Sequence, residues 1–175
     1  MKSLITIKSI AACALFTWVT ASFSHVVLEN KVAVAGSSYK AVLQVGHGCG
    51  ALPTTAIAVQ IPPGFQAAKP HAKAGWTIAI QGKDAVMWTA ASKEAALPSA
   101  HFDEFVLRGK LSDAAGPLWF KVLQTCDDGV NKSSNNWAEV PAVGVSIQGL
   151  KSPAALLEVI LPSTPPVAMP GEHKH

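Results

Sequence analysis

Short runs of β-type residues recur along this chain at close spacing, and each run ends at Gly, Pro, Asn or Asp. No long amphipathic helical pattern interrupts them. About eight short strands with turn residues between them are typical of an all-β fold, and we expect a single β-sandwich of the immunoglobulin or fibronectin type. The expected strands are 26–35, 39–45, 54–61, 76–81, 85–89, 101–107, 118–123 and 143–148. Residues 152–161 fit either a helix, from their Ala and Leu content, or a strand.

The first 24 residues have the three parts of a secretory signal peptide: a positive start, an apolar run over residues 10–19 and a small-residue end, Ala21-Ser22-Phe23-Ser24. Cleavage after Ser24 would make His25 the first residue of the exported chain. Cleavage after Ala21 or after Ser22 satisfies the same preference for small side chains and would leave His25 fourth or third.

Removing 24 of the 175 residues leaves 151, the size of one domain. We expect that domain over 25–161, followed by a flexible Pro-rich tail over 162–175.

Without the signal, the chain has 12 Lys and Arg residues and 11 Asp and Glu residues, which gives a net charge near +1. Such a balance argues against nucleic-acid binding. No later apolar run approaches the roughly 20 residues of a membrane helix. Because the first 24 residues are expected to direct export, the expected location is the periplasm or the extracellular space.

Two cysteines remain after signal removal, because Cys13 lies in the signal. In an oxidising compartment Cys49 and Cys126 are expected to form a disulfide. Closing so long a loop contributes roughly 3–5 kcal/mol to stability in the chain-entropy account. The alternative is a pair of thiolates holding copper(I), which requires a reducing environment.

A chain that begins at His25 would carry a free amine and an imidazole Nδ1 that can chelate one metal ion. Copper(II) is the divalent first-row ion that nitrogen ligands bind most tightly, and it favours tetragonal geometry. A free α-amine has a pKa of roughly 7.7–8.0, so protons compete with copper for it and affinity should weaken in acid. The alternative is that His25 is merely the first residue of a strand.

Further candidate donors lie in the segment 101–107 and after a Ser/Asn-rich segment. Asp103 and Glu104 are neighbours in an expected strand, so their side chains point to opposite faces. A carboxylate inside a sandwich is costly unless it is paired or bound to metal, but the pattern does not choose between the two acids. Trp137 follows an expected polar loop, 133–136, and either packs over the core rim or places its ring face beside a cation. In the tail, Met169, His173 and His175 could form a second, weak copper site or simply be polar tail residues.

Taken together, several segments resemble the YcnI-like domain family of exported bacterial copper-binding proteins. They span about 25–141 and comprise His25-Val26, His47-Gly48-Cys49-Gly50 with Pro53-Thr54-Thr55, Ile61-Pro62, Lys69-Pro70, Gly75-Trp76-Thr77, Phe102-Asp103-Glu104-Phe105, Gln124-Thr125-Cys126, and Trp137 before Pro141.

The resemblance implies a β-sandwich that binds copper(II) in a mono-histidine brace. By this analogy the amine and imidazole of His25 are ligands, Glu104 supplies an oxygen, and Trp137 lies against the metal. Many relatives have a membrane helix near the C-terminus, where this chain has only its Pro-rich tail.

We therefore expect a non-enzymatic copper(II) carrier or sensor that exchanges copper with a periplasmic or membrane copper-handling protein. One alternative is a copper-dependent oxygenase of the lytic polysaccharide type, which would need a second histidine from among His47, His71 and His101. Another is a metal-free secreted domain that binds protein or envelope components.

Overall fold

The computed structural model describes residues 25–163, which contain β-strands and no helix, and hence no helix that could cross a membrane. The strands are β1 (Val27–Leu28), β2 (Val32–Val34), β3 (Ser38–Val45), β4 (Thr54–Gln60), β5 (Phe65–Pro70), β6 (Trp76–Gln81), β7 (Ala85–Ala90), β8 (Asp103–Leu111), β9 (Gly116–Asp127), β10 (Lys132–Trp137) and β11 (Ala155–Ile160). The expected signal peptide and the tail donors Met169, His173 and His175 lie outside the described residues.

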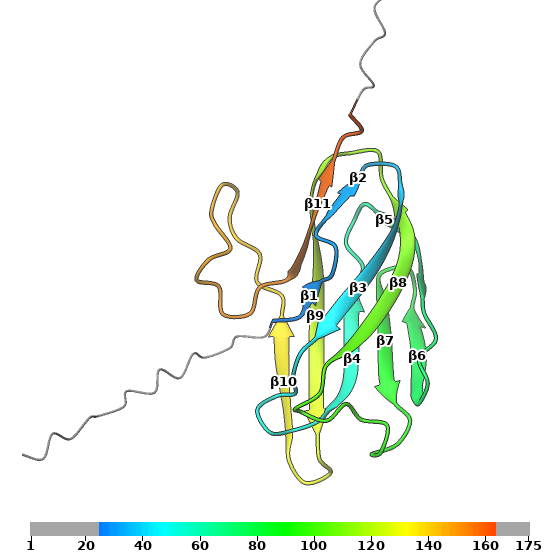
Figure 1. Cartoon of the computed structure of the whole chain (residues 1–175), viewed down its shortest axis with the longest axis vertical. Coiled ribbons are helices and arrows are strands. Elements are labelled where there is room, and N and C mark those ends of the chain that lie inside the picture. The colour runs from blue at the N-terminus through cyan, green and yellow to red at the C-terminus, as the bar shows by residue number, and fades with distance from the viewer. Residues whose placement is uncertain (1–24, 164–175) are drawn as a thin grey trace, which may run out of the picture.

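The strands form two sheets that pack face to face, as Figure 1 shows. The smaller sheet has the order β1-β3-β8-β5. The larger has the order β2-β11-β9-β4-β7-β6, with β10 also paired to β9. All described pairings are antiparallel except that of β2 with β11. The sandwich prediction is confirmed.

Alternate residues of both sheets fill the space between them. Phe105 of β8 meets the rings of Trp88 and Trp76 edge-on, with centroids 5.7 and 5.0 Å away. Phe120 of β9 packs similarly against Phe65 at 5.3 Å. Trp88, Phe105 and Phe120 are each 1% exposed or less, and burying such a side chain contributes about 1.5–3 kcal/mol. This aromatic centre joins the two sheets.

Segment 26–35 is two strands rather than one, because the chain changes sheets within it. β1 pairs with β3 in the smaller sheet, whereas β2 pairs with β11 in the larger. Tyr39 holds this crossing in place by donating a hydrogen bond from its hydroxyl to the carbonyl oxygen of Asn30, at 2.5 Å. Burial and the nearby Glu29 raise the pKa of Tyr39 to about 12, so the hydroxyl keeps its donor proton.

The expected strand at 143–148 is wrong. These residues lie in an irregular loop between β10 and β11, which projects from the body of the sandwich in Figure 1. Gly144 and Gly149 adopt positive φ angles of 80° and 91°, which turn the chain before a ladder can form. Segment 152–161, by contrast, resolves as a strand, β11.

Two strands lack the hydrophobic alternation from which strands were expected. β5 contains Lys69 and Pro70 at an edge of the smaller sheet, where a proline is tolerated.

β10 is the segment Lys-Ser-Ser-Asn-Asn-Trp, so the prediction of a polar loop over 133–136 is wrong. Its register with β9 is continuous over six residues, from Lys132 opposite Asp127 to Trp137 opposite Val122. The hairpin turn at 128–131 imposes this pairing, since Asp128 accepts hydrogen bonds from the backbone N–H groups of Val130 and Asn131.

Candidate metal site

His25 and Trp137 meet where β1 begins and β10 ends, although they are more than a hundred positions apart in the sequence. Their ring centroids are 5.5 Å apart and the ring planes are tilted by 59°. Figure 1 shows the start of β1 beside the end of β10, at one margin of the sandwich. His25 is half-buried, whereas Trp137 is only 6% exposed. The imidazole of His25 thus packs against a buried indole ring.

A buried glutamine fixes the orientation of Trp137. The indole Nε1 donates to Oε1 of Gln124 at 3.0 Å. The Nε2 of Gln124 in turn donates to the carbonyl oxygen of His47 at 2.7 Å and to Oγ1 of Thr54 at 2.8 Å. Gln124 is 1% exposed, so losing any of these partners would leave a buried polar group unsatisfied. The position of the Trp137 ring beside His25 therefore depends on a buried network of hydrogen bonds.

The disulfide Cys49–Cys126 forms as expected and adjoins this network, since Sγ of Cys126 lies 3.8 Å from Oγ1 of Thr54. The two Cα atoms are 5.8 Å apart, and the bridge joins the loop after β3 to β9. Cys126 lies two residues after Gln124 on the same buried face of β9. Because the cysteines are bonded to each other, the copper(I)-thiolate alternative has no basis in this structure.

Glycines on either side of Cys49 have different roles. A Cβ at Gly48 would lie 1.9 Å from the carbonyl oxygen of Leu52, whereas one at Gly50 would meet nothing within 4 Å. Gly50 has a φ of +64°, which alone costs an alanine roughly 1–2 kcal/mol.

Gly48→Ala should therefore lower the free energy of unfolding by about 3 kcal/mol, because the backbone itself must move and strain the disulfide loop. Gly50→Ala should cost about half as much or less. Urea denaturation of both variants tests this contrast, and equal losses would contradict the close approach at Gly48.

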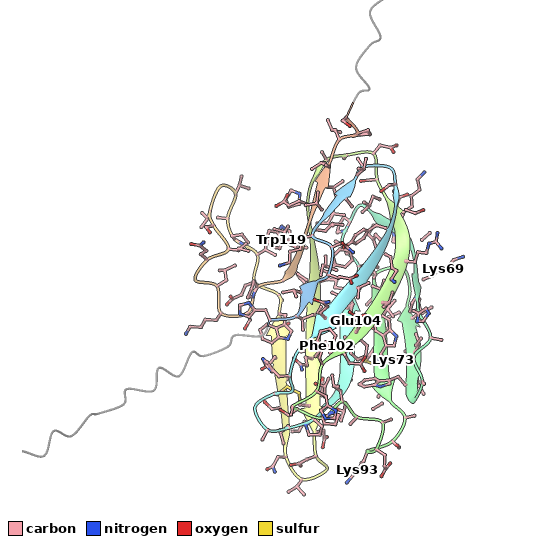
Figure 2. All side chains as sticks on the ribbon, viewed as in Figure 1. Lys69, Lys73, Lys93, Phe102, Glu104 and Trp119 are labelled. Carbon is pink, nitrogen blue, oxygen red and sulfur yellow. A yellow bond between two sulfur atoms is a disulfide. The ribbon has the colours of Figure 1, made fainter. Side chains whose placement is uncertain are left out.

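Glu104 lies on β8, two strands across the smaller sheet from β1. Val27 is in register with Gln44 of β3, and Gln44 is in register with Glu104. The side-chain amide of Gln44 donates to Oε1 of Glu104 at 3.3 Å, and both side chains are half-buried. Side chains alternate between the two faces of β8. Phe105 and Leu107 point into the core, so Glu104 faces outward. Figure 2 labels Glu104 on this sheet.

Asp103 is committed to a different partner. Its Oδ1 lies 2.6 Å from Nζ of Lys73, and the same ammonium donates to the backbone carbonyl of Glu104 at 3.3 Å. Of the two neighbouring acids, Asp103 is already neutralised, whereas the partner of Glu104 is an uncharged amide. This difference leaves Glu104 as the carboxylate suited to a cation.

The other histidines are dispersed. His71 shares a cleft with Glu104, whereas the ring of His47 turns back onto the carbonyl of Gly48 and His101 is exposed. Across 25–163 no three His, Cys, Asp or Glu side chains are grouped closely enough to hold a metal ion.

Sequence reasoning assigned no role to two glutamines at the site: Gln44 was not singled out, and Gln124 appeared only as part of the matching segment Gln124-Thr125-Cys126. For Gln124 a signal was present, because it interrupts an alternation of buried residues, Phe120, Val122 and Cys126, that otherwise has no polar member. A polar residue at such a position needs a buried partner. Gln44 carries no comparable signal, since outward positions of a strand are commonly polar.

The sequence profile of the family described as "Domain of unknown function (DUF1775)" matches residues 25–159. The match begins at His25 and takes in Glu104, Trp137 and both disulfide cysteines. No curated protein sequence is significantly similar to the chain.

Among solved structures, one similar to this chain is an uncharacterized protein from Nocardia farcinica with an immunoglobulin-like fold. It is 25% identical, with a TM-score of 0.65, over 77% of this chain and 97% of that one. A chain of a type I cohesin–dockerin complex from Clostridium thermocellum is 10% identical, with a TM-score of 0.48, over 78% of this chain and 98% of that one. The first supports the immunoglobulin-like fold.

Proposed function

Because the chain belongs to the DUF1775 family, which includes the YcnI-like proteins, we propose that it is an exported copper(II)-binding protein that carries or senses copper. In this proposal copper is cargo, and the protein binds it without acting as an enzyme. The observation that carries the proposal is the seating of His25 against the buried ring of Trp137 at the first residue of the family match.

The family match and the expected signal cleavage point to the same residue. Cleavage after Ser24 is one of the three cuts that the small-residue end allows, and the match begins at His25. A family domain whose first residue is the histidine fits a processed chain in which that residue carries the free amine. This agreement favours cleavage after Ser24 over cleavage after Ala21 or Ser22.

The donor set suits copper(II). The amine and imidazole of His25 would give two nitrogens in one chelate ring, and Glu104 would give an oxygen with one negative charge. Nitrogen ligands of this kind are those to which copper(II) binds most tightly among divalent first-row ions. The remaining positive charge would lie beside the indole of Trp137, whose ring face attracts cations.

Three protein donors also favour a carrier or sensor. Copper(II) in tetragonal geometry takes four close ligands, so one position would be left for water or for a donor from a partner. A partner that supplies this fourth ligand can begin to remove the ion before the brace opens. We propose a periplasmic or membrane copper-handling protein as that partner.

The matched pair Glu104→Gln and Asp103→Asn tests the carboxylate. Glu104→Gln should weaken copper(II) binding about 10- to 100-fold, because a neutral amide oxygen replaces a charged ligand. Asp103→Asn should change affinity no more than about twofold, since Lys73 already pairs with that acid. Competition titration against a copper(II) chelator of known affinity measures both. If the two variants lose affinity equally, Glu104 is not the ligand.

A further inference from the structure

Three cations form a row across the outer face of the smaller sheet. Lys40 of β3 is in register with Arg108 of β8, and Arg108 is in register with Lys69 of β5. Residues directly opposite each other on neighbouring strands share a face, and the row spans about 10 Å from strand to strand. All three side chains are exposed. Figure 2 labels Lys69 at the margin of this sheet.

The acid on this face of β8, Glu104, lies four positions along the strand from Arg108, and the rows on β3, β8 and β5 that contain Arg108 and Lys110 have no acid. The next row contains Ser38, Lys110 and Gln66, which adds a fourth cation. Within residues 25–163 the one ion pair joins Lys73 to Asp103, so no member of the row has a carboxylate within 4 Å. Like charges placed directly opposite on neighbouring strands destabilise a sheet. Protection of a sheet edge explains Lys69, but not Lys40 and Arg108, which lie on interior strands.

Arg108 at the centre of the row is the only arginine in the chain; the other 13 of the 14 basic residues are lysines. A guanidinium presents a rigid fork of N–H donors that matches two oxygens of one oxyanion. The lysines on either side have long flexible stems that can bring their ammonium groups to the same point. The row is thus arranged to surround an anion with more than two acceptor oxygens.

A strained bulge in β5 puts Lys69 into the row. The register shifts between Gln66, opposite Lys110, and Lys69, opposite Arg108, because β5 contains one extra residue there. If the register set by Gln66 continued without the bulge, Lys69 would instead face Leu107, whose side chain is fully buried. Ala67 in the bulge has a φ of +50°, the one positive φ at a non-glycine residue in the described part of the chain.

The facing residue of β8 accommodates the same bulge. A Cβ at Gly109 would lie 2.6 Å from the ring of Phe65 and 2.8 Å from the carbonyl oxygen of Gln66. Bulges that redirect a side chain are frequent beside binding sites, and backbone strain tends to be kept where it serves a function.

We propose that this row binds the phosphate group of a ligand that also has an apolar part. Lys40, Lys69 and Arg108 line a cleft of about 410 Å³ together with Pro70, His71 and Val106. A phosphate monoester offers three oxygens and up to two negative charges, enough for the guanidinium fork and both ammonium groups, whereas a carboxylate offers two oxygens. Pro70 and Val106 provide the apolar surface beside it. The phosphate belongs either to a soluble organic phosphate monoester or to phosphatidic acid, a phospholipid whose headgroup is a phosphate monoester.

Two probes distinguish these sources: phenyl phosphate, and phosphatidylcholine vesicles containing phosphatidic acid. Amide NMR shifts on the exported chain should show saturable binding of phenyl phosphate, with the shifts confined to β3, β8 and β5. Co-sedimentation measures the vesicles. Tighter binding to the vesicles assigns the site to a lipid headgroup, and binding of phenyl phosphate alone assigns it to a soluble ligand.

Arg108→Gln should weaken binding of the preferred probe at least about 10-fold, because charge-assisted hydrogen bonds are lost. Lys69→Gln should weaken it as well. Lys121→Gln is the matched control, since Lys121 is an exposed lysine on β9 of the other sheet and should leave binding unchanged. Copper(II) affinity of Arg108→Gln should stay at the wild-type value, so this proposal stands or fails separately from copper binding.

Three outcomes would overturn the proposal. One is the absence of saturable binding to either probe. The second is an equal loss in Lys121→Gln and Arg108→Gln, which would reduce the effect to net charge. The third is equally tight binding of an acidic Glu-rich peptide, which would make the row a protein-docking face.

Discussion

Replacing His25 by alanine should lower copper(II) affinity at least about 100-fold. The variant keeps an N-terminal amine after processing but loses the imidazole, and with it the chelate ring. Changing a residue that only orients a metal ligand typically costs 10- to 100-fold, so removing a ligand should cost more. Competition titration with a chelator on protein of verified N-terminal mass measures the change. The ring of Trp137 should remain in place, since its hydrogen bond goes to Gln124 and not to His25.

His101→Ala is the matched control for this variant. His101 is an exposed histidine in the loop before β8, and its loss should leave copper affinity within about twofold of wild type if surface histidines contribute little. Both variants should unfold near the wild-type temperature. Equal copper affinity in His25→Ala and wild type would remove His25 from the site.

The double variant Cys49→Ala, Cys126→Ala should lose roughly 3–5 kcal/mol of unfolding free energy, because the bridge closes a long loop in the unfolded chain. The bridge spans 77 positions and joins the loop after β3 to β9. Its removal should also weaken copper binding, since Cys126 adjoins the strand positions that hold Gln124 and Trp137. Urea denaturation gives the first quantity and chelator competition the second.

A reducing agent provides the control. Reduction of the wild-type protein should bring its stability down to that of the double variant, and the double variant itself should not respond. A double variant as stable as the oxidised wild-type protein would show that the bridge contributes nothing to the fold.

Much of the fold follows from patterns that are local in the sequence. Strands β3, β4, β6, β7 and β9 each alternate, or run apolar, over enough residues to be expected before any tertiary contact is known. The disulfide could also be predicted, because only two cysteines lie outside the expected signal segment.

The strands that sequence reasoning missed or misplaced depend on tertiary contacts. β10 is a polar segment that becomes a strand because the Asp128 turn folds it back along β9. Residues 143–148 have the valine and isoleucine of a strand, yet no neighbouring strand is available to them and Val143 is fully exposed. Strand propensity describes a half-buried pleated surface, so it fails where no such surface forms.

The candidate site also has one part that the sequence predicted and one part that it did not. His25, Glu104 and Trp137 were expected from the resemblance to a known family. The structure brings His25 and Trp137 into contact and places Glu104 two strands across from β1. The role of Gln124 as the support of Trp137 depends on side-chain contacts between β9, β10 and the loop at His47, which no local pattern encodes.

The most direct test of copper binding compares two chains that differ only at their first residue. One begins at His25, and the other retains Ser24 before it, so that His25 keeps its imidazole but its nitrogen becomes an amide. Electron paramagnetic resonance during copper(II) titration should show one tetragonal site with two nitrogen ligands in the first chain, saturating at one copper per protein. That signal should be lost or altered, with weaker binding, in the second. Identical spectra and affinities for the two chains would contradict a site built on the amine of His25.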